Sequence, residues 1–112
     1  MKSKFKVISF IMAATLLVST AAVLAGVSRE DFGVGESKAT ARLECSTTWA
    51  RANTYPITSY NHLSTYITGT TASGTISNSG TMEAYITANR FIGACSTHSI
   101  DGIIEQLTVS SN

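Results

Sequence analysis

The sequence contains few charged residues and no excess of either sign. Eight Lys and Arg stand against seven Asp and Glu, and charged residues make up 13% of the 112 residues. Such a chain lacks the strong positive field that would attract nucleic acids or acidic membranes. Eight Gly and a single Pro exclude a collagen-like or Pro-rich low-complexity chain. The length allows one globular domain at most.

Long apolar runs are also missing, except at the N-terminus. There, three lysines within the first six residues precede an apolar stretch that ends in small residues at Ala25. This pattern is typical of a secretory signal peptide over residues 1–25, with cleavage after Ala25 and with Ala21 or Ala22 as alternatives. An uncleaved membrane anchor is the other interpretation, but serine and threonine dilute the apolar run.

Removal of the signal peptide leaves a chain with few large apolar residues. Residues 26–112 number 87 and carry five basic and seven acidic residues, so the net charge becomes 5 − 7 = −2. Leu, Ile, Val and Phe supply only 16 of these residues, whereas Ser and Thr supply 26. A domain of this size buries only about 60–65% of its unfolded surface. The signal peptide predicts a secreted, extracellular protein. The small number of large apolar residues predicts that its domain needs stabilisation beyond its core.

The two cysteines are the obvious source of that stabilisation. An even number of cysteines in a short exported chain predicts a disulfide, which here joins Cys45 to Cys95. On the chain-entropy model this bridge would contribute about 4 kcal/mol.

Two other roles for the cysteines are weaker hypotheses. Cys95 and His98 have a C-x-x-H spacing, and Cys45 and His62 could complete a zinc site. However, no second ligand lies close to Cys45, as a zinc module requires. Cys95 could also be a nucleophile activated by a histidine, but a free thiol is the less expected state after export. We expect no metal and no cofactor.

Alternating apolar and polar residues dominate the chain from Lys38 onward, which predicts strands rather than helices. Residues 26–37 are expected to form a flexible lead-in to a β-rich domain over 38–112. The Asp101–Gly102 pair is a hairpin signal, and Pro56 suggests a turn over 51–56. The predicted strands cover residues 39–45, 59–71, 75–77, 81–91, 94–99 and 103–110. Short strands separated by turns favour an all-β fold, a small antiparallel β-sandwich or barrel-like domain.

No residue pattern in the chain predicts catalysis. Ser96 and His98 lie two residues apart, and on a strand their backbones are about 6.5–7 Å apart. A direct bond between the hydroxyl and the imidazole is therefore not expected, and this segment is interpreted as a polar surface strand. Carboxylate pairs and phosphate-binding glycine loops are not evident. We predict that the protein is not an enzyme.

Two tyrosines on the polar sides of the predicted strands, Tyr66 and Tyr85, are the best candidates for binding. Exposed Tyr beside Ser and Thr is the composition of adaptable contact surfaces, and Thr68 and Trp49 are the further candidates for this contact face. The sequence therefore predicts a secreted, non-enzymatic binding module for a protein or glycan at a cell surface. The alternatives are a self-assembling surface or fibre subunit and a secreted antimicrobial or toxin-like protein. No nucleic-acid partner and no stable membrane insertion are expected.

Overall fold

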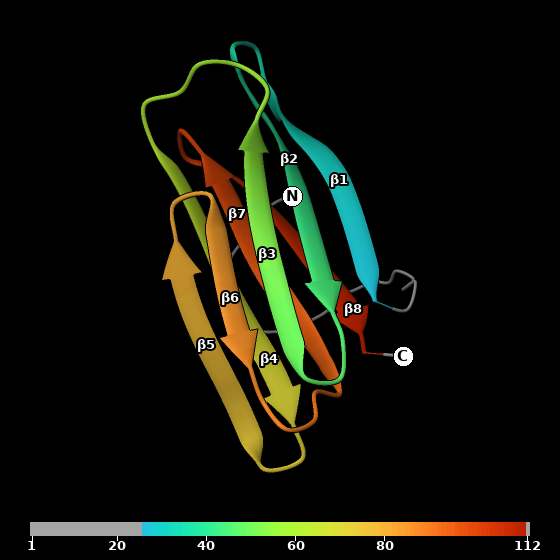
Figure 1. Ribbon diagram of the computed structural model, residues 1–112. Helices are drawn as coiled ribbons and strands as arrows, with labels where there is room; N and C mark the ends of the chain where they lie inside the picture. Colours follow the sequence, from blue (N-terminus) through green and yellow to red (C-terminus); the bar gives the residue numbers. More distant parts are fainter. Residues whose placement is uncertain (1–25, 112) are drawn as a thin grey trace.

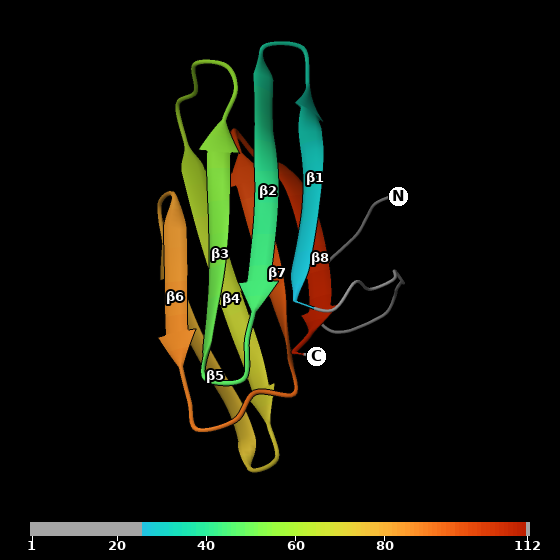
Figure 2. The same cartoon turned by 45° about the vertical axis from the view of Figure 1, so that its right-hand side comes forward.

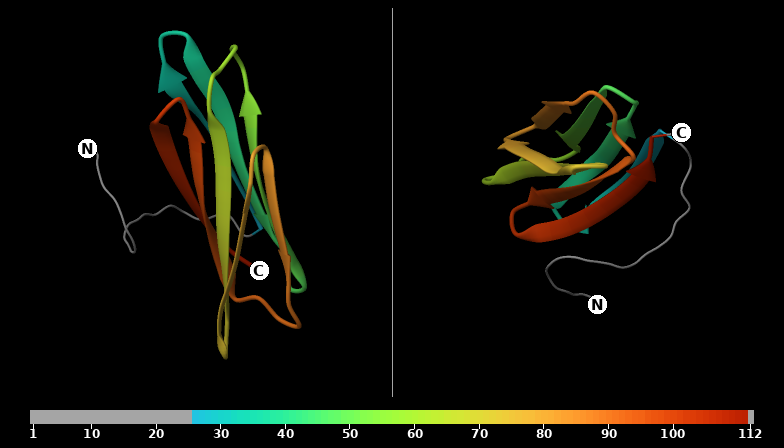
Figure 3. Two further views of the ribbon diagram at one scale, coloured as in Figure 1. Left: turned by 90° about the vertical axis from the view of Figure 1, so that its left-hand side faces the viewer. Right: turned by 90° about the horizontal axis from the view of Figure 1, so that it is seen from below.

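The alternating pattern folds into two stacked antiparallel sheets, in a computed structural model that describes residues 26–111 (Figure 1). Sheet A has the strand order β1-β2-β3-β6, and sheet B has the order β5-β4-β7-β8. Figure 3 shows the two layers end-on. The predicted all-β fold is confirmed, as a sandwich. The strands are β1 (Val27–Val34), β2 (Ser37–Cys45), β3 (Trp49–Pro56), β4 (Leu63–Thr71), β5 (Gly74–Gly80), β6 (Glu83–Thr87), β7 (Gly93–Ile100) and β8 (Ile103–Ser110).

The connections combine local hairpins with crossings between the sheets. β1, β2 and β3 pair in succession, as do β4 with β5 and β7 with β8, whereas β6 returns to lie beside β3 and β7 beside β4. The hairpin between β7 and β8 turns at Asp101 and Gly102, whose φ angles of 49° and 86° are both positive. Two positive φ angles define the tight turn that matches strand twist. The predicted Asp–Gly hairpin is confirmed.

Two segments expected to lack strands form strands. Residues 26–37 are not a flexible lead-in, because β1 pairs with β2 along its whole length. Gly26 anchors its start by donating its amide to the Ser110 carbonyl and by accepting the amide of Cys45. The expected turn over residues 51–56 is most of β3, which lies inside sheet A. Pro56 ends this strand, where a missing N–H is tolerated.

Small side chains make up half of the core cluster between the sheets: five alanines and Cys45. The larger members that pack among them are Leu43, Ile67, Ile86, Phe91, Leu107 and Val109. Gly69 of β4 leaves room for the Phe91 ring, because a β-carbon there would lie 2.4 Å from its Cε1 atom. The same position lies 2.6 Å from the Cδ1 atom of Ile86 on β6, so the two sheets approach closely here.

The predicted Cys45–Cys95 disulfide is wrong. Cys45 is 3% exposed and faces the core, whereas Cys95 is exposed and both thiols are free. The cause is the alternation of β7, in which Ala94 and Ser96 point between the sheets and Cys95 therefore points outward.

We expect the native protein to react with a thiol reagent at Cys95 alone. Burial raises the pKa of the Cys45 thiol, and a buried thiol is inert. Intact mass after labelling should show one adduct on the native protein and a second only after unfolding. A Cys95→Ser variant should give none while native. If neither cysteine reacts, even after unfolding, until a reducing agent is added, the two cysteines are joined by a disulfide and this prediction is wrong.

The proposed signal peptide, residues 1–25, lies outside the described residues. Within residues 26–111, no helix is long and apolar enough to cross a membrane.

Candidate functional site on the outer face of sheet A

The structure separates the four predicted contact residues onto opposite faces of the sandwich. Trp49 of β3 and Tyr85 of β6 point outward from sheet A. Tyr66 and Thr68 of β4 point outward from sheet B. Figure 2 shows sheet A in front of sheet B. A single contact face containing all four residues is therefore wrong, and each half must be judged separately.

On sheet A, the aromatic pair forms a compact cluster with an arginine. The Trp49 and Tyr85 rings are stacked, with centroids 6.4 Å apart and planes inclined by 21°. The Arg51 guanidinium carbon lies 5.7 Å from the Trp49 ring centroid, within the range of a cation–π interaction. The register places Arg51 directly opposite Tyr85. Neighbouring strands thus hold all three side chains on one surface, which we call the aromatic–Arg surface.

Glu44 of β2 fixes the orientation of this arginine. Arg51 donates from Nη2 to Glu44 Oε1 at 2.7 Å, and Arg42 Nη1 reaches the same oxygen at 2.7 Å. Burial of the carboxylate by itself would raise the pKa of Glu44, but the hydrogen bonds from Arg51 and Arg42 outweigh it and the pKa is lowered. Glu44 therefore stays ionised at neutral pH and keeps the guanidinium beside Trp49.

Sheet B presents a different surface. Among its four strands the one charged residue is Glu105, whose position on β8 alternates with the outward residues. Tyr66 is 45% exposed, but the hydroxyls of Ser77 and Thr68 hydrogen-bond to it and lower its pKa. The ring is therefore tied to its own sheet. An uncharged face of hydroxyls offers a partner fewer strong anchors than the aromatic–Arg surface.

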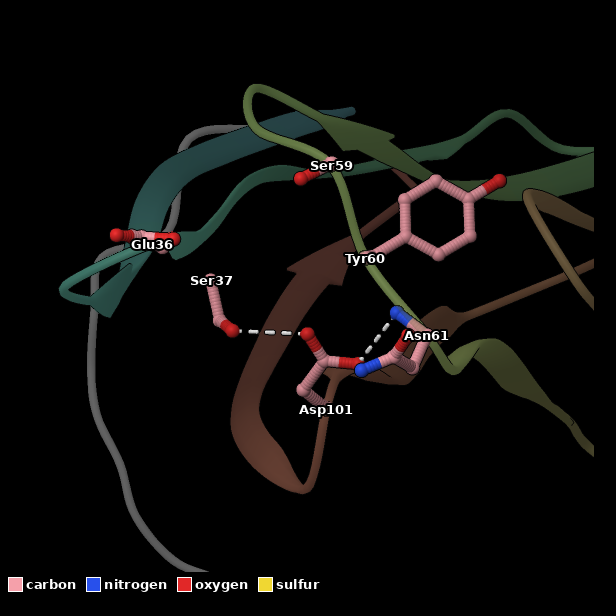
Figure 4. A pocket seen from close by; sticks show the side chains of 6 residues that line it. All are labelled: Glu36, Ser37, Ser59, Tyr60, Asn61 and Asp101. Atoms are coloured by element: carbon pink, nitrogen blue, oxygen red, sulfur yellow. Dashed lines mark hydrogen bonds between the residues drawn. The ribbon is translucent and has the colours of Figure 1, made fainter.

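A polar pocket at the other end of the strands is a structural junction. Asp101 accepts hydrogen bonds from the Ser37 hydroxyl and from the Asn61 amide, each at 2.8 Å (Figure 4). It also accepts the amide of His62 at 2.8 Å. The amide of His62, the hydroxyl of Ser37 and the amide of Asn61 lower the pKa of Asp101. The carboxylate joins the β7–β8 turn to the β1–β2 hairpin and to the segment before β4. Both of its oxygens therefore already accept hydrogen bonds within the protein.

The expectation that Ser96 cannot reach His98 is also wrong. Ser96 Oγ lies 2.6 Å from His98 Nε2. The backbone separation was the wrong measure, because two inward side chains can lean together along a strand. The two residues are 2% and 0% exposed, so they do not form a polar surface strand either. Burial between the sheets gives this pair no access to a substrate.

The Ser96–His98 pair begins a hydrogen-bonded chain through the core. Thr65 donates to the Thr81 carbonyl at 2.9 Å, so its hydroxyl accepts from Thr54 at 2.7 Å. Thr54 then accepts from His98 Nδ1–H at 2.9 Å. A neutral imidazole has one donor and one acceptor, so Nε2 accepts from Ser96. The three hydroxyls and both ring nitrogens of this network thus each have a hydrogen-bond partner. Burial lowers the pKa of His98 to about 4, and it outweighs a hydrogen bond with the Asn53 backbone that raises the pKa.

The four residues considered for a zinc site do not come together. Within residues 26–111, no three His, Cys, Asp or Glu side chains are grouped closely enough to hold a metal ion. His98 uses both ring nitrogens inside the core, and His62 is exposed beside the Asp101 junction.

Comparisons with known proteins find no matching family model, no matching curated sequence and no matching solved structure. The site must therefore be judged on its own chemistry. Sequence analysis missed Arg51 as a member of it, because residues 51–56 were assigned to a turn. The signal available was the alternation of Arg51 with Ala50 and Ala52, which places the arginine on the same side of the strand as Trp49.

Proposed function

We propose that the protein is an exported, non-enzymatic binding module that holds a partner protein through the aromatic–Arg surface. The stacked and accessible Trp49–Tyr85 pair beside Arg51 is the observation that carries this proposal. Trp, Tyr and Arg are the residue types that dominate the binding energy of protein interfaces. Export is supported by the signal-peptide pattern of residues 1–25.

Two further features favour a protein partner. The cluster stands on paired strands rather than on a loop, so its side chains lose little freedom on binding. Charges of both signs surround the rings, with Arg42, Glu44 and Glu83 nearby, and such charges specify orientation and partner.

The test compares two tyrosines of nearly equal exposure on opposite faces. Tyr85 is 47% exposed and Tyr66 is 45% exposed. Labelled protein is titrated onto intact cells of the producing strain and of its neighbours, and bound label is measured by flow cytometry. Tyr85→Ala and Trp49→Ala are expected to weaken binding about 30-fold or more, the scale of a hot-spot residue. Tyr66→Ala should bind as the native protein does.

Enzymatic treatment of the cells identifies the class of partner. Protease treatment that removes binding supports the proposal, whereas loss after glycosidase treatment alone would replace the protein partner with a glycan. Binding that depends on Tyr66 and not on Tyr85 would overturn the assignment of the surface. The absence of binding to any cell or secreted protein would overturn the function.

A further inference from the structure

One of the four edge strands differs from the other three in having no charged residue. β1 carries Arg29, Glu30 and Asp31 in succession, β6 carries Glu83 and β8 carries Glu105. β5 has neither a charge nor a proline, and all seven of its residues are exposed. Charges and prolines are the usual protection of an edge against pairing with another strand. Figure 1 shows β5 at the outer border of sheet B.

The hydrogen bonds of β4 show which backbone groups of β5 are available. The Thr70 carbonyl accepts from Ile92 on the β7 side, so the alternate residues of β4 bond to β5. Thr71 and Gly69 pair with Gly74 and Ile76, so the backbone groups of Gly74 and Ile76 bond to β4. The residues that alternate with them on β5, Thr75 and Ser77, therefore point their amides and carbonyls away from β4. The next outward amide, that of Ser79, is bonded to its neighbour Asn78 at 2.9 Å.

Asn78 limits the free part of this edge. Its side-chain oxygen accepts the Ser79 amide, and its Nδ2 donates to the Tyr85 carbonyl of β6 at 3.0 Å. The available edge is therefore centred on Ile76, with an outward residue on each side. Ile76 is 38% exposed.

We propose that two copies of the protein associate by antiparallel pairing of their β5 edges about a twofold axis at Ile76. In this register Thr75 of each copy bonds to Ser77 of the other through both amide and carbonyl. The two Ile76 residues form the non-hydrogen-bonded pair, whose Cα atoms lie about 4.5 Å apart. A twofold interface joins each surface to itself, and an uncharged edge meets no like charge there. Sheet B then continues from one copy to the other.

The first test measures association directly. Pairing of one strand from each copy buries less surface than standard complexes, which bury about 1,200 Å² or more. The association is therefore expected to be weak. Sedimentation velocity should show the average mass of the native protein rising toward twice that of the monomer as concentration increases. Ile76→Lys places two like charges at the axis and should abolish the rise. Ile104→Lys, at the exposed β8 edge, is the matched control and should not.

A covalent variant tests the register independently of affinity. In a Cys95→Ser background, Ile76→Cys places two thiols across the axis at a Cα separation within the about 4.4–6.8 Å range of disulfides. Mild oxidation should convert it to a covalent dimer at least tenfold faster than Ile104→Cys in the same background. Circular dichroism confirms that each variant is folded.

Either of two results would overturn this proposal: a native protein that stays monomeric at the highest concentration, or equal cross-linking of the two cysteine variants. The proposal is independent of the aromatic–Arg surface, since Ile76→Lys changes no residue of that surface. Cell binding that survives this substitution, together with loss of the dimer, supports both.

Discussion

Lowering the pH from 7 to 5 is expected to reduce the free energy of unfolding by about 2 kcal/mol, through His98 alone. Burial lowers the pKa of this histidine to about 4 in the folded protein, whereas an unfolded histidine titrates near 6.5. Between these values the unfolded chain binds more protons, so stability falls as the pH falls. The full loss of about 3 kcal/mol is approached near pH 4 and levels off about one pH unit below it, where His98 is protonated in both states.

The physical cause is the hydrogen-bonded chain through the core. A protonated imidazole has two donors and no acceptor, so the Ser96 hydroxyl could no longer donate to Nε2 and would have to turn to accept from it. The protonated ring would also place an unpaired charge between the sheets, which is costly. A domain stabilised by about 5–15 kcal/mol would be noticeably weakened by this one group.

Urea unfolding at pH 7, 6 and 5 measures the effect, because most carboxylates remain ionised over this range. In His98→Gln, which keeps a side-chain donor and acceptor, the loss between pH 7 and 5 should nearly disappear, although the variant is less stable at pH 7. His62→Gln, at the exposed histidine, should lose stability as the native protein does. A slope that persists in His98→Gln and vanishes in His62→Gln would contradict this account.

Gly69→Ala is expected to destabilise the protein by about 1–3 kcal/mol, the usual cost of overpacking a core. The new β-carbon would lie 2.4 Å from Phe91 Cε1 and 2.6 Å from Ile86 Cδ1. Phe91 is 1% exposed and Ile86 is 5% exposed, so neither side chain can move into solvent. The strain must spread into both sheets.

Thermal and urea unfolding of a double-mutant cycle isolates this contact. Phe91→Leu removes the ring atom that the new β-carbon would strike, so the pair of substitutions should cost about 1 kcal/mol less than the sum of the two single changes. Ser64→Ala, at an outward position of the same strand, should change stability by no more than about 0.5 kcal/mol. Strict additivity of Gly69→Ala and Phe91→Leu would show that the crowding is relieved elsewhere.

Local patterns in the sequence were sufficient to predict the fold class. The alternation over 39–45 and 103–110 corresponds closely to β2 and β8, and Asp101–Gly102 turns as expected. These features depend on steric preferences and burial within a few neighbouring residues, so a short stretch of chain contains them. β1 was missed because it has no clear alternation: it is largely exposed and depends on its pairing with β2.

Only the tertiary structure decided which residues meet. The predicted disulfide failed because Cys95 occupies an outward position of β7, and Tyr66 and Tyr85 were separated because their strands belong to different sheets. Side-chain direction reverses at every residue of a strand, and strand order arises from contacts between distant segments. The sequence alone thus determined strands, turns and composition. The packing of the two sheets determined the aromatic–Arg surface, the buried hydrogen-bonded network around His98 and the position of the uncharged β5 strand at an edge.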